Sequence, residues 1–171
     1  MAETNVMQKP RIEKVVVNIG AGESGEKLVK AEKLLEKLTG RKPVRTVSKH
    51  KIPAWNLRKK EPIGCKVTLR GKGAVEFLKR GLSAKDNTLQ ESSFTDDGNF
   101  SFGIHECIDI PGMKYDPEIG ILGMNLTTTM KKPGYRVKHR RLKKAEIPKK
   151  HQVTREEAMQ FAKEQFGVKI E

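Results

Sequence analysis

Long apolar runs, cysteine and aromatic residues are all scarce in this sequence of 171 residues. No stretch approaches the roughly 18 consecutive apolar residues that a bilayer-crossing helix needs, so we expect no membrane span. The N-terminus lacks the apolar core of a secretory signal. The two cysteines, Cys65 and Cys107, lie far apart and outside any C-x-x-C pair. This pattern favours two reduced, buried thiols, typical of the cytosol, over a disulfide or a zinc site.

The polar residues form no catalytic or metal-binding pattern. The four histidines do not combine with either cysteine into the four ligands of a structural zinc site. Asp96, Asp97, Asp109 and Asp116 fall in loop-like sequence, where aspartates commonly cap helices and close turns. We therefore expect no metal, no cofactor and no enzymatic activity.

Positive charge is abundant and concentrated in two segments. The formal net charge is +14. Residues 41–72 hold 11 Lys and Arg against one acid, Glu61, and residues 131–151 hold 10 against one acid, Glu146. The other 118 residues carry a net charge of −5. Two cationic segments on a mildly acidic body predict an RNA-binding surface, with Arg41 and Arg45 among the expected RNA contacts of the first segment. Each segment could instead be a solvated face.

Hydrophobic periodicity predicts one domain spanning residues 1–171. We expect strands at 12–19, 43–47, 63–70, 99–105 and 121–130, and helices at 28–38, 75–82 and 154–166. This order predicts an α+β fold, with a single antiparallel or mixed sheet of about five strands and helices packed on one face. The other face would then be open to RNA, and the residues expected to point toward it are Asn18, Lys66, Thr68 and Arg70.

A glycine-rich turn offers an alternative function. Gly20, Gly22 and Gly25 form a G-x-G-x-x-G sequence between a strand and a helix, as in dinucleotide-binding folds. The carboxylate expected about 20 residues later is missing, although Arg45 could suit the phosphate of NADP. Glu23 would repel a pyrophosphate. The motif therefore leaves an NADP-binding oxidoreductase as a rival hypothesis.

The lone tryptophan lies in a basic loop, residues 49–61. A large aromatic side chain among cations can stack on a base while the cations contact phosphates. Alternatively, Trp55 could fold back and hold the loop against the core. The cations of this loop are Lys49, Lys51, Arg58, Lys59 and Lys60.

The basic C-terminal segment, residues 131–151, has the composition of an RNA-contacting tail. Arg side chains can bind two phosphate oxygens at once, and the candidates here are Arg136, Lys138, Arg140 and Arg141. His139 and His151 lie in the same segment, and we expect them to contact phosphates. The alternative is a flexible, solvated linker.

Several motifs, in order along the chain, resemble the large-subunit ribosomal protein five family. They are VVVNIGAGE at 15–23, TGRKPV at 39–44, PIGCKVTLR at 62–70, GNFSFGI at 98–104, YDP at 115–117, KPGYRV at 132–137 and IPKKH at 147–151. The last two resemble the archaeal and eukaryotic branch. Two positions depart from the bacterial pattern, since this chain has Arg41 where bacterial members tend to carry Gln and Trp55 where they tend to carry Phe.

The resemblance implies a structural, cytoplasmic component of the ribosome. It implies binding of 5S rRNA through the open sheet face, with RNA contacts from Asn18 and Thr68, and contact with large-subunit rRNA in the central protuberance. It further implies that the basic loop approaches P-site tRNA and that the protein contacts a small-subunit protein across an intersubunit bridge. A generic RNA chaperone is the second rival hypothesis, because the same charge would permit it.

Overall fold

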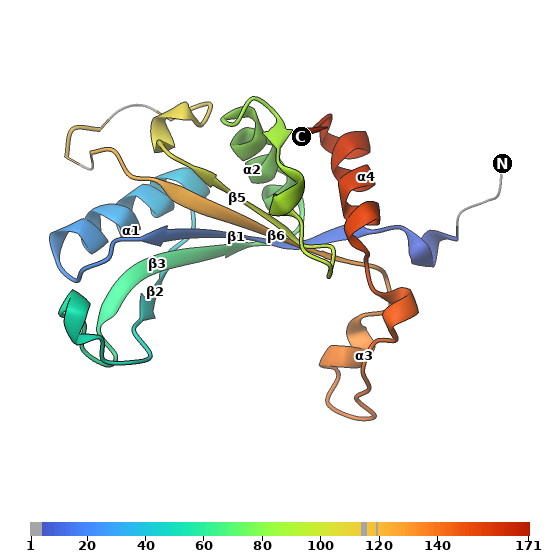
Figure 1. Ribbon diagram of the computed structural model, residues 1–171. Helices are drawn as coiled ribbons and strands as arrows, with labels where there is room; N and C mark the ends of the chain where they lie inside the picture. Colours follow the sequence, from blue (N-terminus) through green and yellow to red (C-terminus); the bar gives the residue numbers. More distant parts are fainter. Residues whose placement is uncertain (1–4, 114–115, 119) are drawn as a thin grey trace.

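Five strands form one antiparallel sheet in the computed structural model, which describes residues 5–113, 116–118 and 120–171 (Figure 1). The strand order is β2-β3-β1-β6-β5, and every neighbouring pair is antiparallel. The strands are β1 (Arg11–Gly20), β2 (Val44–Val47), β3 (Pro62–Leu69), β5 (Phe100–Ile104) and β6 (Met124–Lys131). The predicted α+β class is confirmed.

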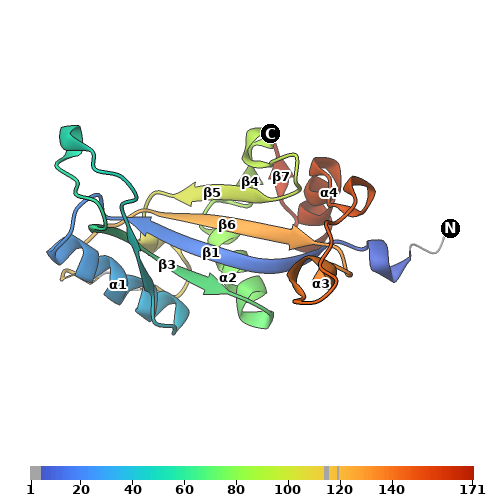
Figure 2. The same ribbon diagram turned by 90° about the horizontal axis from the view of Figure 1, so that it is seen from below.

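Helices cover one face of this sheet. They are α1 (Glu26–Thr39), α2 (Lys72–Ser83) and α4 (Arg155–Phe166); a fourth, α3 (Arg136–His139), is a single turn. In Figure 2, which looks onto the sheet from below, α2 lies behind the strands. The core fills the space between helices and sheet. It contains Leu34 and Leu35 of α1, Phe77 of α2, and Val15 and Val17 of β1, each at most 1% exposed.

Local sequence explains where these helices begin and end. Gly40 adopts φ 63° directly after α1, a left-handed conformation that glycine reaches without steric cost. Thr154 and Glu157 form the predicted capping box at the start of α4. Within α2, a side chain on Gly81 would lie 2.7 Å from the Leu126 side chain, so this glycine lets α2 approach β6 closely.

Several short elements were not predicted from the sequence. The strands β4 (Thr88–Leu89) and β7 (Lys169–Ile170) form a small parallel pair that holds the C-terminus near α2. Strand β6 begins at Met124 and not at 121, because β5 ends at Ile104 and leaves residues 121–123 without a partner strand. Single 3-10 turns are η1 (Val6–Gln8), η2 (Pro53–Trp55), η3 (Glu91–Ser93), η4 (Cys107–Asp109) and η5 (Lys149–His151).

The sheet topology contradicts the dinucleotide-binding hypothesis. A dinucleotide fold needs parallel strands joined by a crossover helix, whereas both neighbours of β1, β3 and β6, run antiparallel to it. Gly22 and Gly25 have φ angles of 77° and 114°, so they serve the turn that leads into α1.

The described residues contain neither a membrane-spanning helix nor a cluster of metal ligands. None of the helices there has the length and apolar character that crossing a bilayer requires. Across the same residues, no group of three or more His, Cys, Asp or Glu side chains is placed to hold a metal ion. Cys65 and Cys107 are free and buried.

Candidate nucleic-acid interface

The sheet face turned away from the helices is polar and has no acid in its central rows. Lys66, Asn18 and Asn125 form one row across β3, β1 and β6, and Thr68 and Thr127 lie in the next row. These side chains are exposed or half-buried, whereas their neighbours along each strand lie in the core. We call this surface the open face; it comprises Lys14, Val16, Asn18, Val44, Thr46, Gly64, Lys66, Thr68, Ser101, Gly103, Asn125, Thr127 and Thr129.

Polar side chains in these two central rows are free to bind a ligand. Within the described part of the chain, no hydrogen bond engages the side chains of Asn18, Lys66 or Thr68. Their donors and acceptors are therefore satisfied by water, which a ligand can displace.

Two glycines leave parts of the open face without side chains above the backbone. A β-carbon on Gly64 would lie 2.8 Å from the Ile19 carbonyl oxygen and 2.9 Å from Thr46 Oγ1. A β-carbon on Gly103 would lie 3.2 Å from Asn125 Oδ1. Without side chains at these positions, a bulky ligand can come close to the backbone of the sheet.

Arg41 joins the open face at its β2 edge. Arg41, Lys42, Val44, Lys66 and Thr68 line a shallow hollow of about 310 Å³ there. Three residues that sequence reasoning singled out, from two separate motifs, are thus brought together. Arg70 follows β3 and is exposed.

Arg45 lies on the opposite side of the sheet. It pairs with Cys65 in the strand register, so its side chain points toward α1. There it forms a two-point ion pair with Glu32, including a 3.0 Å hydrogen bond from Nη2 to Oε2. The Arg45 hydrogen bond holds the pKa of Glu32 below its ordinary value. The structure therefore does not bring Arg45 to the open face with Asn18 and Thr68.

The basic loop is a closed hairpin that extends from the sheet. Ile52 and Leu57 exchange two backbone hydrogen bonds of 3.0 and 3.1 Å, and the turn between them contains η2. Glu61, the single acid of residues 41–72, accepts hydrogen bonds from the Arg58 backbone N–H and the Ser24 hydroxyl. These two bonds lower the pKa of Glu61, so this carboxylate stays ionised and braces the base of the loop.

Trp55 lies exposed at the tip of this hairpin. Its exposed fraction is 70%, while Leu57 is 8% exposed. The alternative in which Trp55 folds back to hold the loop is therefore wrong, because Leu57 is the buried side chain of the tip. Around it, the cations Lys49, Lys51, Arg58, Lys59 and Lys60 are all exposed.

The basic C-terminal segment is anchored by a buried lysine. The Lys132 side chain is 5% exposed, and its ammonium donates to Glu157 Oε1 at 2.7 Å and to the Gln152 carbonyl oxygen at 3.1 Å. The His151 ring nitrogen Nε2 lies 2.6 Å from the Pro133 carbonyl oxygen, which ties the two ends of the segment together. These contacts attach both ends of the segment to the body of the protein.

Four further cations of this segment are accessible to solvent. Arg136, Lys138, Arg140 and Arg141 are exposed. Arg140 Nε donates to the Lys143 carbonyl oxygen at 2.7 Å, so part of the outer turn is internally ordered. In Figure 1 the η2 loop and the α3 segment both extend below the sheet, on the side opposite α2 and α4. The two cationic segments therefore flank the open face.

Sequence reasoning missed several residues of this surface. Lys14, Asn125 and Thr127 lie on the open face beside Asn18. Alternation along each strand could have shown that these residues point away from the core. The sequence did not show that β6 pairs with β1, which is what brings Asn125 and Thr127 beside Asn18. Lys132 shows the converse error, since a lysine counted as part of a cationic surface is buried in an ion pair.

Comparison with known proteins identifies the family of this chain. Residues 5–58 match the family model described as ribosomal protein L5, and residues 62–161 match the model that describes the C-terminus of the same ribosomal family. A protein of Methanosphaera stadtmanae named large ribosomal subunit protein uL5 is 54% identical over 98% of this chain and 99% of its own length.

Two further relatives bear the same name. The protein of Sulfurisphaera tokodaii is 56% identical over 99% of this chain and 98% of its own length. The protein of Methanococcus aeolicus is 54% identical over 99% of this chain and 95% of its own length. These relatives are archaeal, which agrees with the branch that the C-terminal motifs indicated.

The matches confirm several expectations from the sequence. A ribosomal-protein family supplies structural components, so the chain is not an enzyme and it works on the cytoplasmic ribosome. Both family models and relatives that are more than half identical over almost the whole chain agree, and the chain therefore belongs to the ribosomal protein L5 family of the large ribosomal subunit.

Proposed function

We propose that this chain binds 5S rRNA on its open face and holds it, together with large-subunit rRNA, in the central protuberance. Asn18 and Thr68 hydrogen-bond to RNA groups, and Arg41, Lys66 and Arg70 neutralise phosphates beside them. One observation carries the proposal, namely the unpartnered polar side chains in rows without acids, flanked by two cationic segments.

The chemistry of the open face suits RNA better than protein. Amide and hydroxyl side chains can bind base edges and ribose 2′-hydroxyls, which distinguish RNA from DNA. The buried centre of a protein interface is usually apolar, whereas Val16 and Val44 are the apolar side chains among the residues of this face. The flanking cations supply the salt-dependent part of the binding.

The flanking segments would reach further partners. The basic C-terminal segment would contact large-subunit rRNA through Arg136, Lys138, Arg140 and Arg141. The basic loop would approach P-site tRNA, with the exposed Trp55 at its tip. The family resemblance alone supports a contact with a small-subunit protein across an intersubunit bridge.

The first test is a gel-shift titration of 5S rRNA with tRNA as competitor. The double variant Asn18→Ala, Thr68→Ala should lose selective binding to 5S rRNA. The matched control is Ser83→Ala, Gln165→Ala, which removes two exposed polar side chains from α2 and α4 and should bind like the wild type. If wild type and double variant bind both RNAs equally well, the protein is a generic RNA chaperone and the proposal fails.

Salt dependence tests the electrostatic part. If about eight phosphates are engaged, the logarithm of the affinity should fall against the logarithm of the salt concentration with a slope of roughly −6 to −7. A flat response would contradict the role of the cationic segments.

The tRNA contact can be tested by cleavage from a tethered iron reagent. The native cysteines are buried, so the variant Trp55→Cys offers one reactive thiol at the tip of the basic loop. In reconstituted large subunits we expect this variant to direct cleavage of P-site tRNA. The control variant Gln165→Cys, on α4, should not. Cleavage from neither position would remove the tRNA contact from the proposal.

A further inference from the structure

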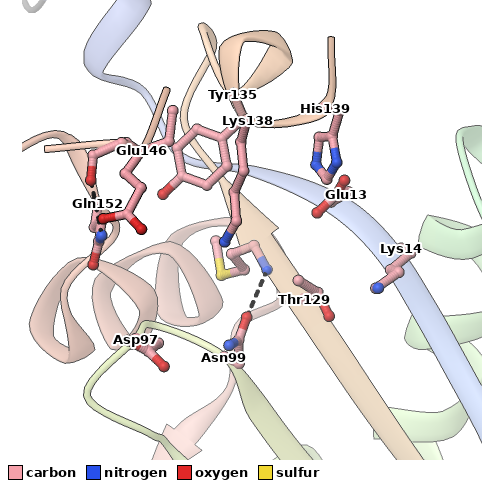
Figure 3. A pocket seen from close by; sticks show the side chains of 12 residues that line it. Glu13, Lys14, Asp97, Asn99, Thr129, Tyr135, Lys138, His139, Glu146 and Gln152 are labelled. Atoms are coloured by element: carbon pink, nitrogen blue, oxygen red, sulfur yellow. Dashed lines mark hydrogen bonds between the residues drawn. The ribbon is translucent and has the colours of Figure 1, made fainter. Parts of the chain in front are cut away.

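A cavity lies where the open face meets the basic C-terminal segment. Its volume is about 440 Å³ (Figure 3). Lys14 and Thr129, which pair across β1 and β6, belong both to the open face and to this cavity. Tyr135 and Lys138 line it from the C-terminal segment. An RNA that crosses the open face would therefore pass the mouth of the cavity.

The cavity walls are held in place before any ligand arrives. The amide oxygen of Asn99 accepts a 3.2 Å hydrogen bond from the Met130 backbone N–H, which orients the Asn99 side chain and leaves its NH₂ group as a donor. Tyr135 is half-buried, and burial raises the pKa of its hydroxyl, although a backbone hydrogen bond from Val153 opposes this. The Tyr135 ring therefore stays neutral and offers a flat apolar surface in the cavity wall.

Charged groups of both signs line the cavity, and three of them form no ion pair with a described residue. In Figure 3 the ammonium of Lys138 points between Tyr135 and Asn99. No ion pair in the described part of the chain involves Lys138, Asp97 or Glu146. A carboxylate accepts hydrogen bonds, an ammonium donates them, and the Asn99 amide group adds a further donor.

This combination favours a base over a phosphate. The carboxylates of Glu13, Asp97 and Glu146 outnumber the two lysines that line the cavity, so a phosphate group is disfavoured inside it. The exposed cations Arg136, Arg140 and Arg141 lie in the same C-terminal segment outside the lining. A nucleotide would thus place its base inside and its phosphates outside. The volume falls in the range of small-ligand sites and excludes a double helix.

Guanine fits the donors and acceptors best. Its Watson–Crick edge presents two adjacent N–H donors, at N1 and N2, beside the acceptor O6. A carboxylate such as that of Glu146 can accept from both donors, and the Lys138 ammonium can donate to O6. Proteins that read RNA by sequence commonly hold unstacked bases in this way, against an aromatic ring.

We propose that this cavity holds a single unstacked guanine of the ribosomal RNA that lies on the open face. The inference rests on the proposed function, because that RNA brings the guanine to the cavity mouth. It adds a base-reading site beyond the row around Asn18 and Thr68.

Kethoxal probing tests this proposal, because the reagent modifies N1 and N2 of guanine. Complexes of the protein with 5S and large-subunit rRNA would be probed with wild type, Glu146→Gln and Lys138→Gln. One unpaired guanine should be protected by the wild type and should become at least about fivefold more reactive in both variants, the lower end of what a two-point base contact is worth. Both side chains are exposed, so thermal melting should confirm that the variants fold.

The matched control is Lys150→Gln, which removes an exposed cation of the same segment outside the cavity and should leave the protection intact. Dimethyl sulfate, probing adenine and cytosine in parallel, checks the choice of base. The proposal is overturned if no guanine changes reactivity, or if an adenine or cytosine responds in its place. If Asn18→Ala, Thr68→Ala loses 5S rRNA binding while guanine reactivity is the same in Glu146→Gln, Lys138→Gln and the wild type, the cavity proposal is rejected and the proposed function is kept. A guanine footprint without selective 5S rRNA binding would reject the proposed function and keep the cavity.

Discussion

Replacing Lys132 by methionine should destabilise the protein although the residue lies in a segment rich in exposed cations. The substitution keeps an unbranched side chain of similar length and removes the ammonium. Glu157 Oε1 and the Gln152 carbonyl oxygen then lose donors at 2.7 and 3.1 Å. The expected loss in free energy of unfolding follows from these two hydrogen bonds.

A hydrogen bond that involves a charged group contributes about 1.5–3 kcal/mol, and the Lys132 ammonium is the donor in both bonds. Two facts reduce the total. The Glu157 side chain is 39% exposed, so water can solvate it, and the buried methionine recovers part of the apolar contact. We expect a loss of about 2–3 kcal/mol, which for a domain of this size lowers the melting temperature by roughly 5–10 °C.

Urea denaturation followed by circular dichroism measures this loss. The matched control is Lys131→Met, the neighbouring residue, whose side chain is 40% exposed and lies 3.7 Å from Glu13. An exposed pair of that kind contributes less than about 1 kcal/mol. If Lys132→Met and Lys131→Met have the same stability, the buried ion pair does not anchor the segment and the reasoning is refuted. The salt slope of RNA binding should stay unchanged in Lys132→Met, since a buried ammonium neutralises no phosphate.

Three other predictions concern the loop, the sheet and the thiols. Lowering the pH should release the basic loop, because the pKa of Glu61 is depressed in the folded protein. The hydrogen bonds of Glu61 stabilise the loop above about pH 4.3, the ordinary carboxylate pKa, and this stabilisation is lost as the pH falls through the lower folded pKa. The anisotropy of Trp55 fluorescence should show this transition in the wild type and not in Glu61→Gln. Gly64→Ala should lower the free energy of unfolding by about 1–3 kcal/mol, because the new β-carbon lies 2.8 Å from the Ile19 carbonyl oxygen, which is part of the backbone. Gly103→Ala should cost less, because its β-carbon meets only the movable Asn125 side chain. Equal melting temperatures for the two variants would contradict this prediction. Burial raises the pKa of Cys65 to about 11, with a smaller contribution from Glu32, and Cys107 is buried as well. Because neither thiol is accessible, Ellman's reagent at pH 8 should label neither cysteine until urea unfolds the protein.

The expected elements came from local patterns that depend on few neighbours. Leucines at helical spacing between Leu28 and Leu38 predicted α1, and a glycine at position 40 predicted its end. Alternation predicted β3 and β5, and the Thr154 capping box predicted the start of α4. These signals survive folding because they reflect hydrogen bonding and side-chain spacing within one element.

The sequence predicted the position of a candidate site residue only where the pattern of its own strand shows which side faces the core. Asn18, Lys66 and Thr68 were expected on the open face because alternation along a strand fixes which side a residue takes. Arg45 shows the limit of this reasoning, because its strand was too short and too exposed for alternation to show which side faces α1.

By itself, the sequence determined the main strands and helices, the α+β class, the two cationic segments and the ribosomal family. Each of these depends on residues that are close in the chain or on their total charge. Only the tertiary structure decided that Lys132 is buried while Trp55 is exposed, that β6 adds Asn125 and Thr127 to the open face, and that a cavity forms between β1 and α3. These outcomes depend on strand order and on how distant segments close against each other, and long-range packing of this kind leaves no periodic trace in the chain.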